Sequence, residues 1–362
     1  MNKIKLGLFT ILILLGLVLA GCGTGNTQDN KSTENKNNEN TPAAETEEKP
    51  LKSEKLQYYF TANEGGSISK IDVSTNEVIK EINADGAVHN VQVSPDGKIV
   101  GATVVPEMNH GGEAMEMKGA AMFFDSETNE LLKTIEVGNH PAHIVFTEDG
   151  KYALVTNNED NSVSVIDMNN YSVIQTINTG KGPHGFRISA DSQKAYIANM
   201  GENSVSVLDL KSMKEEKKIT VGSTPVTTAI TSDGKTLVAT LNAENMLAIV
   251  DIDTGEVQKV GVGKGPAQVY IDANNQNAYV ANQGTENAPS NSISVVDLAT
   301  KKVSGTIETG KGSHGVVTSP DGKRLYVTNM YENTVSVIDT AQMKVIDTIE
   351  VGETPNGISI MN

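Results

Sequence analysis

The sequence predicts an all-β fold, a seven-bladed propeller of four-stranded blades, and three observations support this prediction. A strand-like segment that ends in aspartate recurs seven times, usually at a spacing of about 42 residues. Each repeat holds four short segments of strand character, separated by Asp, Gly, Asn and Lys residues that favour turns. The first repeat lacks its first strand, and the chain ends on a segment of that type.

Residues 1–21 are predicted to be a signal peptide. An apolar run from Leu6 to Leu19 follows two lysines and has the length of a signal-peptide core, not of a membrane span. The run ends in Leu19-Ala20-Gly21-Cys22, which resembles the lipobox of bacterial lipoproteins. The resemblance implies cleavage before Cys22 and lipidation of its sulfur, which would anchor the protein to the cell membrane outside the cytoplasm. The alternative is an uncleaved anchor helix.

Residues 22–54 are predicted to form a disordered tether behind the lipidated Cys22. After this cysteine the segment contains only Ala43, Ala44 and Leu51 as apolar residues, so it cannot bury enough surface to offset the entropy of ordering. Cys22 is the single cysteine of the chain, and the folded body therefore has no disulfide.

Residues 55–362 contain the repeats, and residues 183–221 show one of them clearly. Its four strand-like segments are "PHGFRISAD", "KAYIANM", "NSVSVLDL" and "EEKKITV", and Ser204 to Val207 alternate polar and apolar side chains with the period of a strand. At the C-terminus, "PNGISIMN" matches only the first of these segments. We expect it to join the three strands of the N-terminal repeat, which closes the ring and removes an exposed sheet edge.

A short motif recurs at the second strand of the repeats. It appears as "LVTN" at residues 154–157, "YIAN" at 196–199, "YVAN" at 279–282 and "YVTN" at 326–329, and "SPDGK" occurs at 94–98 and 319–323. These segments resemble the YVTN β-propeller repeat family, and the resemblance extends over about residues 56–362. Propellers of this kind include surface-layer proteins, lactonases and the propeller domains of haem-d1 and copper reductases, so the resemblance implies the fold and leaves the function open. The asparagines and the turn aspartates are expected to be structural.

The histidines concentrate at one position of the repeat. This position lies seven residues before the turn that follows the first strand of each repeat. Three blades have a histidine there: His89, His184 and His314. In a fourth blade, His143 lies one residue further along. Because the innermost strands of a propeller line its channel, we expect these imidazoles to meet at one mouth. Imidazole suits copper, zinc or iron, so they are candidate metal ligands. The alternative is that each ring only bonds the backbone of a neighbouring blade.

An insertion in the second repeat holds four of the twelve methionines of the chain. It connects the second and third strands, and we expect it on the same face as the histidines. Thioether sulfur with imidazole suits copper, above all Cu(I), which is therefore the expected cofactor. The alternative is that these residues serve as adaptable packing material or as a pliable surface for a partner. The candidate ligands in this segment are Met108, His110, Met115, Met117 and Met122.

Arg187 is one of two arginines and falls within a predicted innermost strand. A buried arginine needs a carboxylate or a bound anion. We predict that Arg187 and His184, three residues apart on one strand, contribute to a ligand-binding site; the alternative is a structural ion pair.

Composition and missing motifs narrow the function. A net charge of −16 disfavours nucleic acid as a partner. No C-x-x-C-H supports covalent haem, and no G-x-S-x-G indicates a serine hydrolase. Three hypotheses remain: a lipid-anchored surface module that binds copper, another small ligand or an envelope protein; a lactonase-like or metal-dependent redox enzyme; and a structural surface-layer protein.

Overall fold

The computed structural model describes residues 57–106 and 118–361. Within these ranges no helix is long and apolar enough to cross a membrane. The predicted signal peptide, the tether and five of the predicted site residues lie outside them. These residues are Cys22, Met108, His110, Met115 and Met117.

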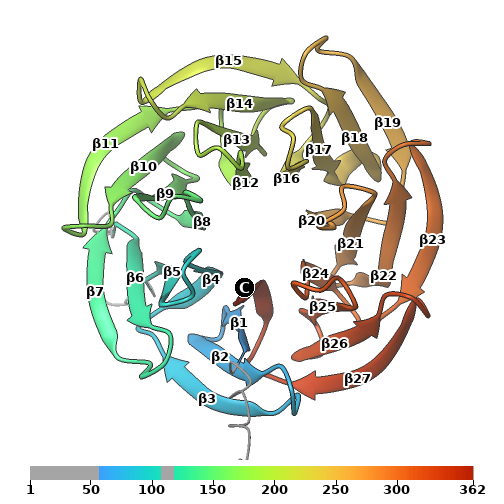
Figure 1. Ribbon diagram of the computed structural model, residues 1–362, viewed down its shortest axis with the longest axis horizontal. Coiled ribbons are helices and arrows are strands. Elements are labelled where there is room, and N and C mark those ends of the chain that lie inside the picture. The colour runs from blue at the N-terminus through green and yellow to red at the C-terminus, as the bar shows by residue number, and fades with distance from the viewer. Residues whose placement is uncertain (1–56, 107–117, 362) are drawn as a thin grey trace, which may run out of the picture. The chain divides into compact units, whose positions relative to one another are not determined.

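The strands of the described residues form seven four-stranded antiparallel sheets, arranged as blades around a central channel (Figure 1). From the channel outward, blade 1 consists of β28 (Pro355–Ile360), β1 (Tyr58–Asn63), β2 (Ser67–Asp72) and β3 (Val78–Asn83). Blade 2 consists of β4 (Ala87–Val93), β5 (Ile99–Val105), β6 (Ala120–Asp125) and β7 (Leu131–Glu136). Blade 3 consists of β8 (Pro141–Phe146), β9 (Tyr152–Asn157), β10 (Ser162–Asp167) and β11 (Ser172–Asn178).

The other four blades repeat this order. Blade 4 consists of β12 (Pro183–Ile188), β13 (Lys194–Asn199), β14 (Ser204–Asp209) and β15 (Lys214–Thr220). Blade 5 consists of β16 (Pro225–Ile230), β17 (Thr236–Leu241), β18 (Met246–Asp251) and β19 (Val257–Gly261), with a 3-10 turn, η1 (Asn242–Glu244), before β18. Blade 6 consists of β20 (Pro266–Ile271), β21 (Asn277–Thr285), β22 (Ala288–Asp297) and β23 (Lys302–Glu308). Blade 7 consists of β24 (Ser313–Thr318), β25 (Arg324–Asn329), β26 (Thr334–Asp339) and β27 (Lys344–Glu350).

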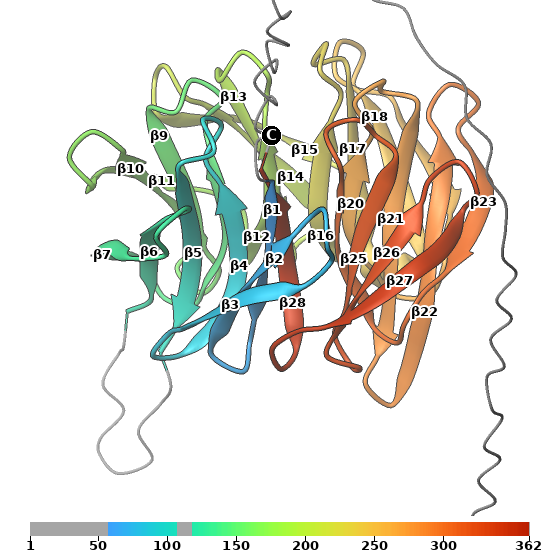
Figure 2. The same cartoon turned by 60° about the horizontal axis from the view of Figure 1, so that its bottom comes forward.

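The predicted ring closure is confirmed. The C-terminal strand β28 pairs antiparallel with β1, with Tyr59 opposite Ile360 and Phe60 opposite Ser359. Figure 2 shows β28 next to β1, the strand furthest from it in the described sequence. Closure therefore uses the same main-chain pairing as the interior of each blade, and it pairs the edge of β1 that would otherwise be exposed.

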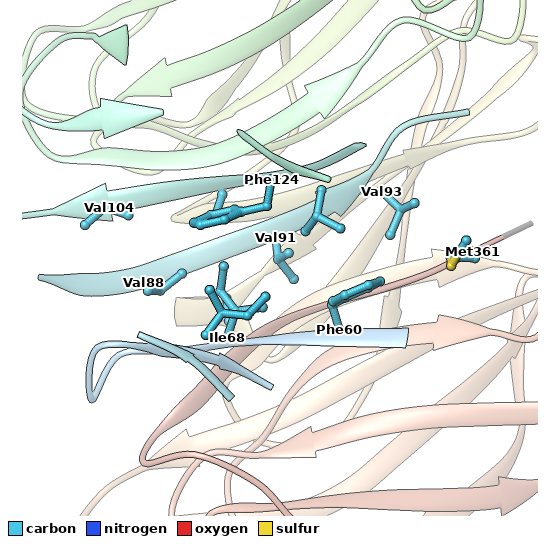
Figure 3. Close-up of a cluster of buried hydrophobic side chains, with 12 residues drawn as sticks. Phe60, Ile68, Val88, Val91, Val93, Val104, Phe124 and Met361 are labelled. Carbon is cyan, nitrogen blue, oxygen red and sulfur yellow. The ribbon is translucent and has the colours of Figure 1, made fainter. Parts of the chain in front are cut away.

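The core lies between neighbouring blades because each twisted sheet buries both of its faces. One hydrophobic cluster joins blades 1 and 2, and includes Phe60, Ile68, Val91 and Phe124 (Figure 3). Lys70 crosses the same boundary: its Nζ donates to the backbone carbonyl of Ser126 at 2.7 Å. The fourth strands are mostly exposed on the perimeter, as the burial pattern of β11 shows.

The repeated asparagines and aspartates have the structural roles that their turn chemistry predicts. Asn157, at the end of β9, donates through Nδ2 to the hydroxyls of Ser162 and Ser164 on β10, both at 3.0 Å. Asp72 ends β2 and accepts the backbone N–H groups of Ser74 and Thr75 through Oδ1. These contacts hold the ends of the strands and leave the chemistry to other residues.

Candidate functional site

The starts of the innermost strands surround one mouth of the channel. In blade 2, Ala87 at the start of β4 pairs with Val105 at the end of β5, and Ala120 at the start of β6 lies opposite Val104. Antiparallel pairing thus brings the described ends of the β5–β6 connection to the mouth where β4 begins. Residues 107–117 of that connection, which were predicted to lie on this face, are outside the described ranges.

Three imidazoles from consecutive blades meet at this mouth. His89 on β4, His143 on β8 and His184 on β12 each offer one ring nitrogen, and these atoms all lie within 4.8 Å of one another. The Nε2 atoms of His89 and His184 are 3.2 Å apart. The rings of His143 and His184 have centroids 4.9 Å apart. We call His89, His143 and His184 the histidine cluster.

Neighbouring acceptors orient two of these rings. His89 Nδ1 lies 2.9 Å from Glu64 Oε1, and His184 Nδ1 lies 3.2 Å from the backbone carbonyl oxygen of Val226. Both acceptors favour a proton on Nδ1, which leaves the two Nε2 lone pairs directed at each other. A proton or a cation between them relieves this repulsion. The same arrangement, with a carboxylate or carbonyl behind each imidazole, fixes the ring orientation of metal-binding histidines.

The distance between the Nε2 atoms of His89 and His184 fits a first-row transition metal. Two nitrogens bound at about 2.0–2.1 Å in a tetrahedral site lie about 3.3 Å apart, close to the observed 3.2 Å between the Nε2 atoms of His89 and His184. The nitrogen of His143 lies within 4.8 Å of the other two and would complete a set of three. A tetrahedral ion on this cluster would keep its fourth position open.

Among the three histidines of the cluster, His143 is the one whose ring makes no hydrogen bond with the described residues. It is 1% exposed, and neither ring nitrogen has a hydrogen-bond partner among the described residues. Its burial, and then the charge of His184, hold its pKa well below the ordinary value, so the ring is neutral and able to act as a ligand. A buried polar group without a partner costs about 1–3 kcal/mol, which a bound cation would offset.

Glu64 is a site residue that the sequence did not reveal to us. It follows Asn63 at the end of β1, and Asn356 Nδ2 donates to the same oxygen that faces His89, at 2.6 Å. Burial acts to raise the pKa of Glu64, but the hydrogen bond and charge of His89, with the bond from Asn356, outweigh it and lower the pKa to about 2. Glu64 directly follows the asparagine that ends the second strand-like segment of the repeat, and Met200 occupies the same position in blade 4. Comparing this position between blades would have shown that Glu64 is a carboxylate where another repeat has an uncharged residue.

The other predicted ligands among the described residues are not part of the histidine cluster. His314 on β24 is buried at the same mouth, but its Nδ1 faces the carbonyl of Asn356 at 3.2 Å and it is not part of the histidine cluster. Burial, and then the charge of His89, lower its pKa to about 4. Met122 lies on β6 and packs against the hydrophobic cluster between blades 1 and 2, which gives it a packing role.

Arg187 is on the same strand as His184 but nearer its other end. It lines a cavity of about 360 Å³ that also includes the turn residues Pro95, Glu148 and Asn275, which follow the innermost strands. The structure therefore places Arg187 at the opposite mouth from the histidine cluster, and the two residues do not form one site.

Known proteins resemble this chain in sequence pattern and in fold. The profile of the family described as YNCE-like beta-propeller matches residues 118–277 and 273–362. No curated protein matches the sequence. Solved structures with a similar fold include the hydrazine synthase of Kuenenia stuttgartiensis, with 22% identity, a TM-score of 0.65, and coverage of 75% of this chain and 89% of that one.

Two further structures share the architecture. A putative 6-phosphogluconolactonase from Bacteroides fragilis has 15% identity and a TM-score of 0.68, over 87% of this chain and 100% of the other. The dihydro-heme d1 dehydrogenase NirN, in complex with DHE, has 13% identity and a TM-score of 0.62, over 84% of this chain and 75% of the other. At these identities the likeness concerns the fold alone.

Proposed function

The chain belongs to the YNCE-like β-propeller family, and we propose that it acts as a binding module that holds one transition-metal ion on His89, His143 and His184. The fold itself serves many unrelated functions, so the argument rests on the site. The observation that carries it is the convergence of three ring nitrogens within 4.8 Å, from three successive blades.

Copper is the ion that this donor set favours. All three ligands are imidazoles, which suit copper and zinc, and the affinity of nitrogen sites for divalent first-row ions is highest for Cu(II). No acidic side chain is among the three ligands, which disfavours calcium and magnesium. The methionines predicted as further ligands, Met108, Met115 and Met117, would add thioether sulfur suited to Cu(I).

Metal titration of the purified full-length protein tests this proposal. We expect saturable binding of one Cu(II) per chain, and weaker binding of Zn(II). Replacing His89, His143 and His184 together by alanine is expected to abolish it. His314→Ala is the matched control, because His314 is buried at the same mouth outside the cluster. Unchanged copper binding in the triple variant would disprove the metal site.

A metal-dependent hydrolase is the second candidate, on one specific observation. Three protein ligands leave a position where an ion can bind water and lower its pKa, as in catalytic zinc sites. A screen of lactone substrates with and without added metal separates this function from binding alone. Metal-dependent turnover that disappears in His184→Ala would favour the enzyme; no turnover with any lactone would leave the binding module.

We also propose that Cys22 carries a lipid that anchors the protein to the cell membrane, outside the cytoplasm. The support is the Leu19-Ala20-Gly21-Cys22 segment behind an apolar run. Cells fed a labelled fatty acid are expected to label the wild-type protein and not Cys22→Ser. Equal labelling of both proteins would contradict this anchor.

A further inference from the structure

The channel has a second ring of residues near the mouth opposite the histidine cluster. Each innermost strand contributes one residue, three positions beyond the layer that contains His89 and His184. All seven line the cavity of about 360 Å³, a volume suited to a small molecule. They are Gln92, Val145, Arg187, Ala229, Tyr270, Val317 and Ser359.

Arg187 is the one cation of the cavity lining, and its charge is not neutralised by an ion pair among the described residues. Its guanidinium donates through Nη1 to the carbonyl of Phe186 at 3.0 Å, although a guanidinium has five N–H donors. Arg324, the other arginine, is at the start of β25 and pairs with Asp339 at 2.8 Å. Burial acts to lower the pKa of Arg187, and Tyr270 and Glu148 oppose this; an arginine stays charged in proteins.

The acids of the lining do not take the place of a bound anion. Asp272 uses its carboxylate within its own turn, where it accepts the backbone N–H groups of Gln276 and Asn277. Burial raises the pKa of Glu148, even though the charge of Arg187 acts in the other direction. Arg187 therefore presents donors without a partner among the described residues to the cavity at this mouth, and a bound anion would satisfy them.

The charge of the lining selects the kind of anion. One guanidinium matches one carboxylate, which it can bind through two parallel N–H···O bonds. A phosphate dianion would add a second negative charge close to the Asp272 carboxylate, which already lines the cavity. Val145, Ala229 and Val317 supply apolar wall on the same ring. The remainder of the ligand should therefore be hydrocarbon.

We propose that this cavity binds a small molecule with a single carboxylate and a short apolar body, and that Arg187 holds the carboxylate. This site is distinct from the proposed metal site, because none of its residues belongs to the histidine cluster. The channel thus carries two chemically different sites, one at each mouth.

Ligand-observed NMR on the full-length protein tests the proposal, with hexanoate and benzoate as probes. Each is compared with its neutral amide, hexanamide or benzamide, which keeps the shape and removes the charge. We expect saturable binding of at least one of the two carboxylates, and at least tenfold weaker binding of its amide. This comparison uses the unaltered protein, so it does not depend on the folding of a variant.

Variants then locate the site. Arg187→Gln is expected to raise the dissociation constant of the carboxylate at least tenfold, while Arg324→Gln, the matched control outside the cavity, leaves it unchanged. Both variants should still bind one copper ion at the opposite mouth, which shows that each is folded. The proposal is overturned if neither carboxylate binds, if amides bind as tightly, or if Arg187→Gln binds like the wild type.

Discussion

Replacing His143 by leucine separates the structural cost of its buried imidazole from its role as a ligand. The ring is 1% exposed, and both of its nitrogens lack partners among the described residues. Leucine fills a similar volume without a polar atom, so it removes a desolvation cost of about 1–3 kcal/mol. We expect the metal-free leucine variant to have a higher free energy of unfolding than the metal-free wild type, by about this amount.

Copper should reverse the order of stability. A ligand that binds only the folded state stabilises it by about 4 kcal/mol when its free concentration is about 1,000 times the dissociation constant. The wild type gains this stabilisation through three imidazoles, whereas the variant retains only His89 and His184 and gains much less. The wild type should therefore be the more stable protein when copper is present.

Urea unfolding followed by circular dichroism, once with a chelator and once with copper, measures both effects. His314→Leu is the control: it breaks the contact with the Asn356 carbonyl, so it should lower stability equally under the two conditions. Two results would refute the reasoning about His143: a leucine variant less stable than the wild type without metal, or an equal gain from copper in both proteins.

Three further predictions concern the groups behind the site, the ring closure and the turns. Glu64→Gln should weaken copper binding about 10- to 100-fold, because the carboxylate orients His89. Glu159→Gln, which alters the carboxylate beside the exposed His140, should leave copper binding unchanged. Equal effects of the two variants in a copper titration would contradict this role of Glu64. Deleting residues 355–362 exposes the edge of β1, so we expect aggregation by gel filtration and no cooperative thermal transition; a monomer of unchanged midpoint would count against the closure. Stability should fall as the pH drops below about 4, because carboxylates whose pKa is lower in the folded state bind more protons when unfolded. A thermal midpoint that stays constant from about pH 6 to about pH 2.5 would argue against this dependence. Hydrogen bonds from their own turns lower the pKa of Asp72, Asp125, Asp251, Asp297 and Asp339.

The repeat pattern determined the architecture before any coordinates. A strand alternates with a period of two, and one unit recurs seven times, so the number of blades, the strands in each and the closure by residues 355–360 all followed from local signals. The same logic placed His89, His184 and His314 at equivalent starts of innermost strands, because a position within a repeat maps to a height along the channel.

Side-chain contacts between blades depended on the tertiary structure. The register of β8 shifts between Pro141 and Ile144, so the direction of the His143 ring could not be deduced from regular alternation. Glu64 reaches His89 from the connection after β1, on a different blade, and no local pattern joins the two residues.

The repeat therefore established which residues share a mouth of the channel, and tertiary packing selected three of the histidines as a cluster and left His314 outside it. The tertiary structure also showed that Arg187 and His184 do not share a site, because Arg187 lines a cavity that does not include His184. The physical reason is that periodicity encodes backbone pairing, whereas a site depends on rotamers, register shifts and the partners that neighbouring blades present.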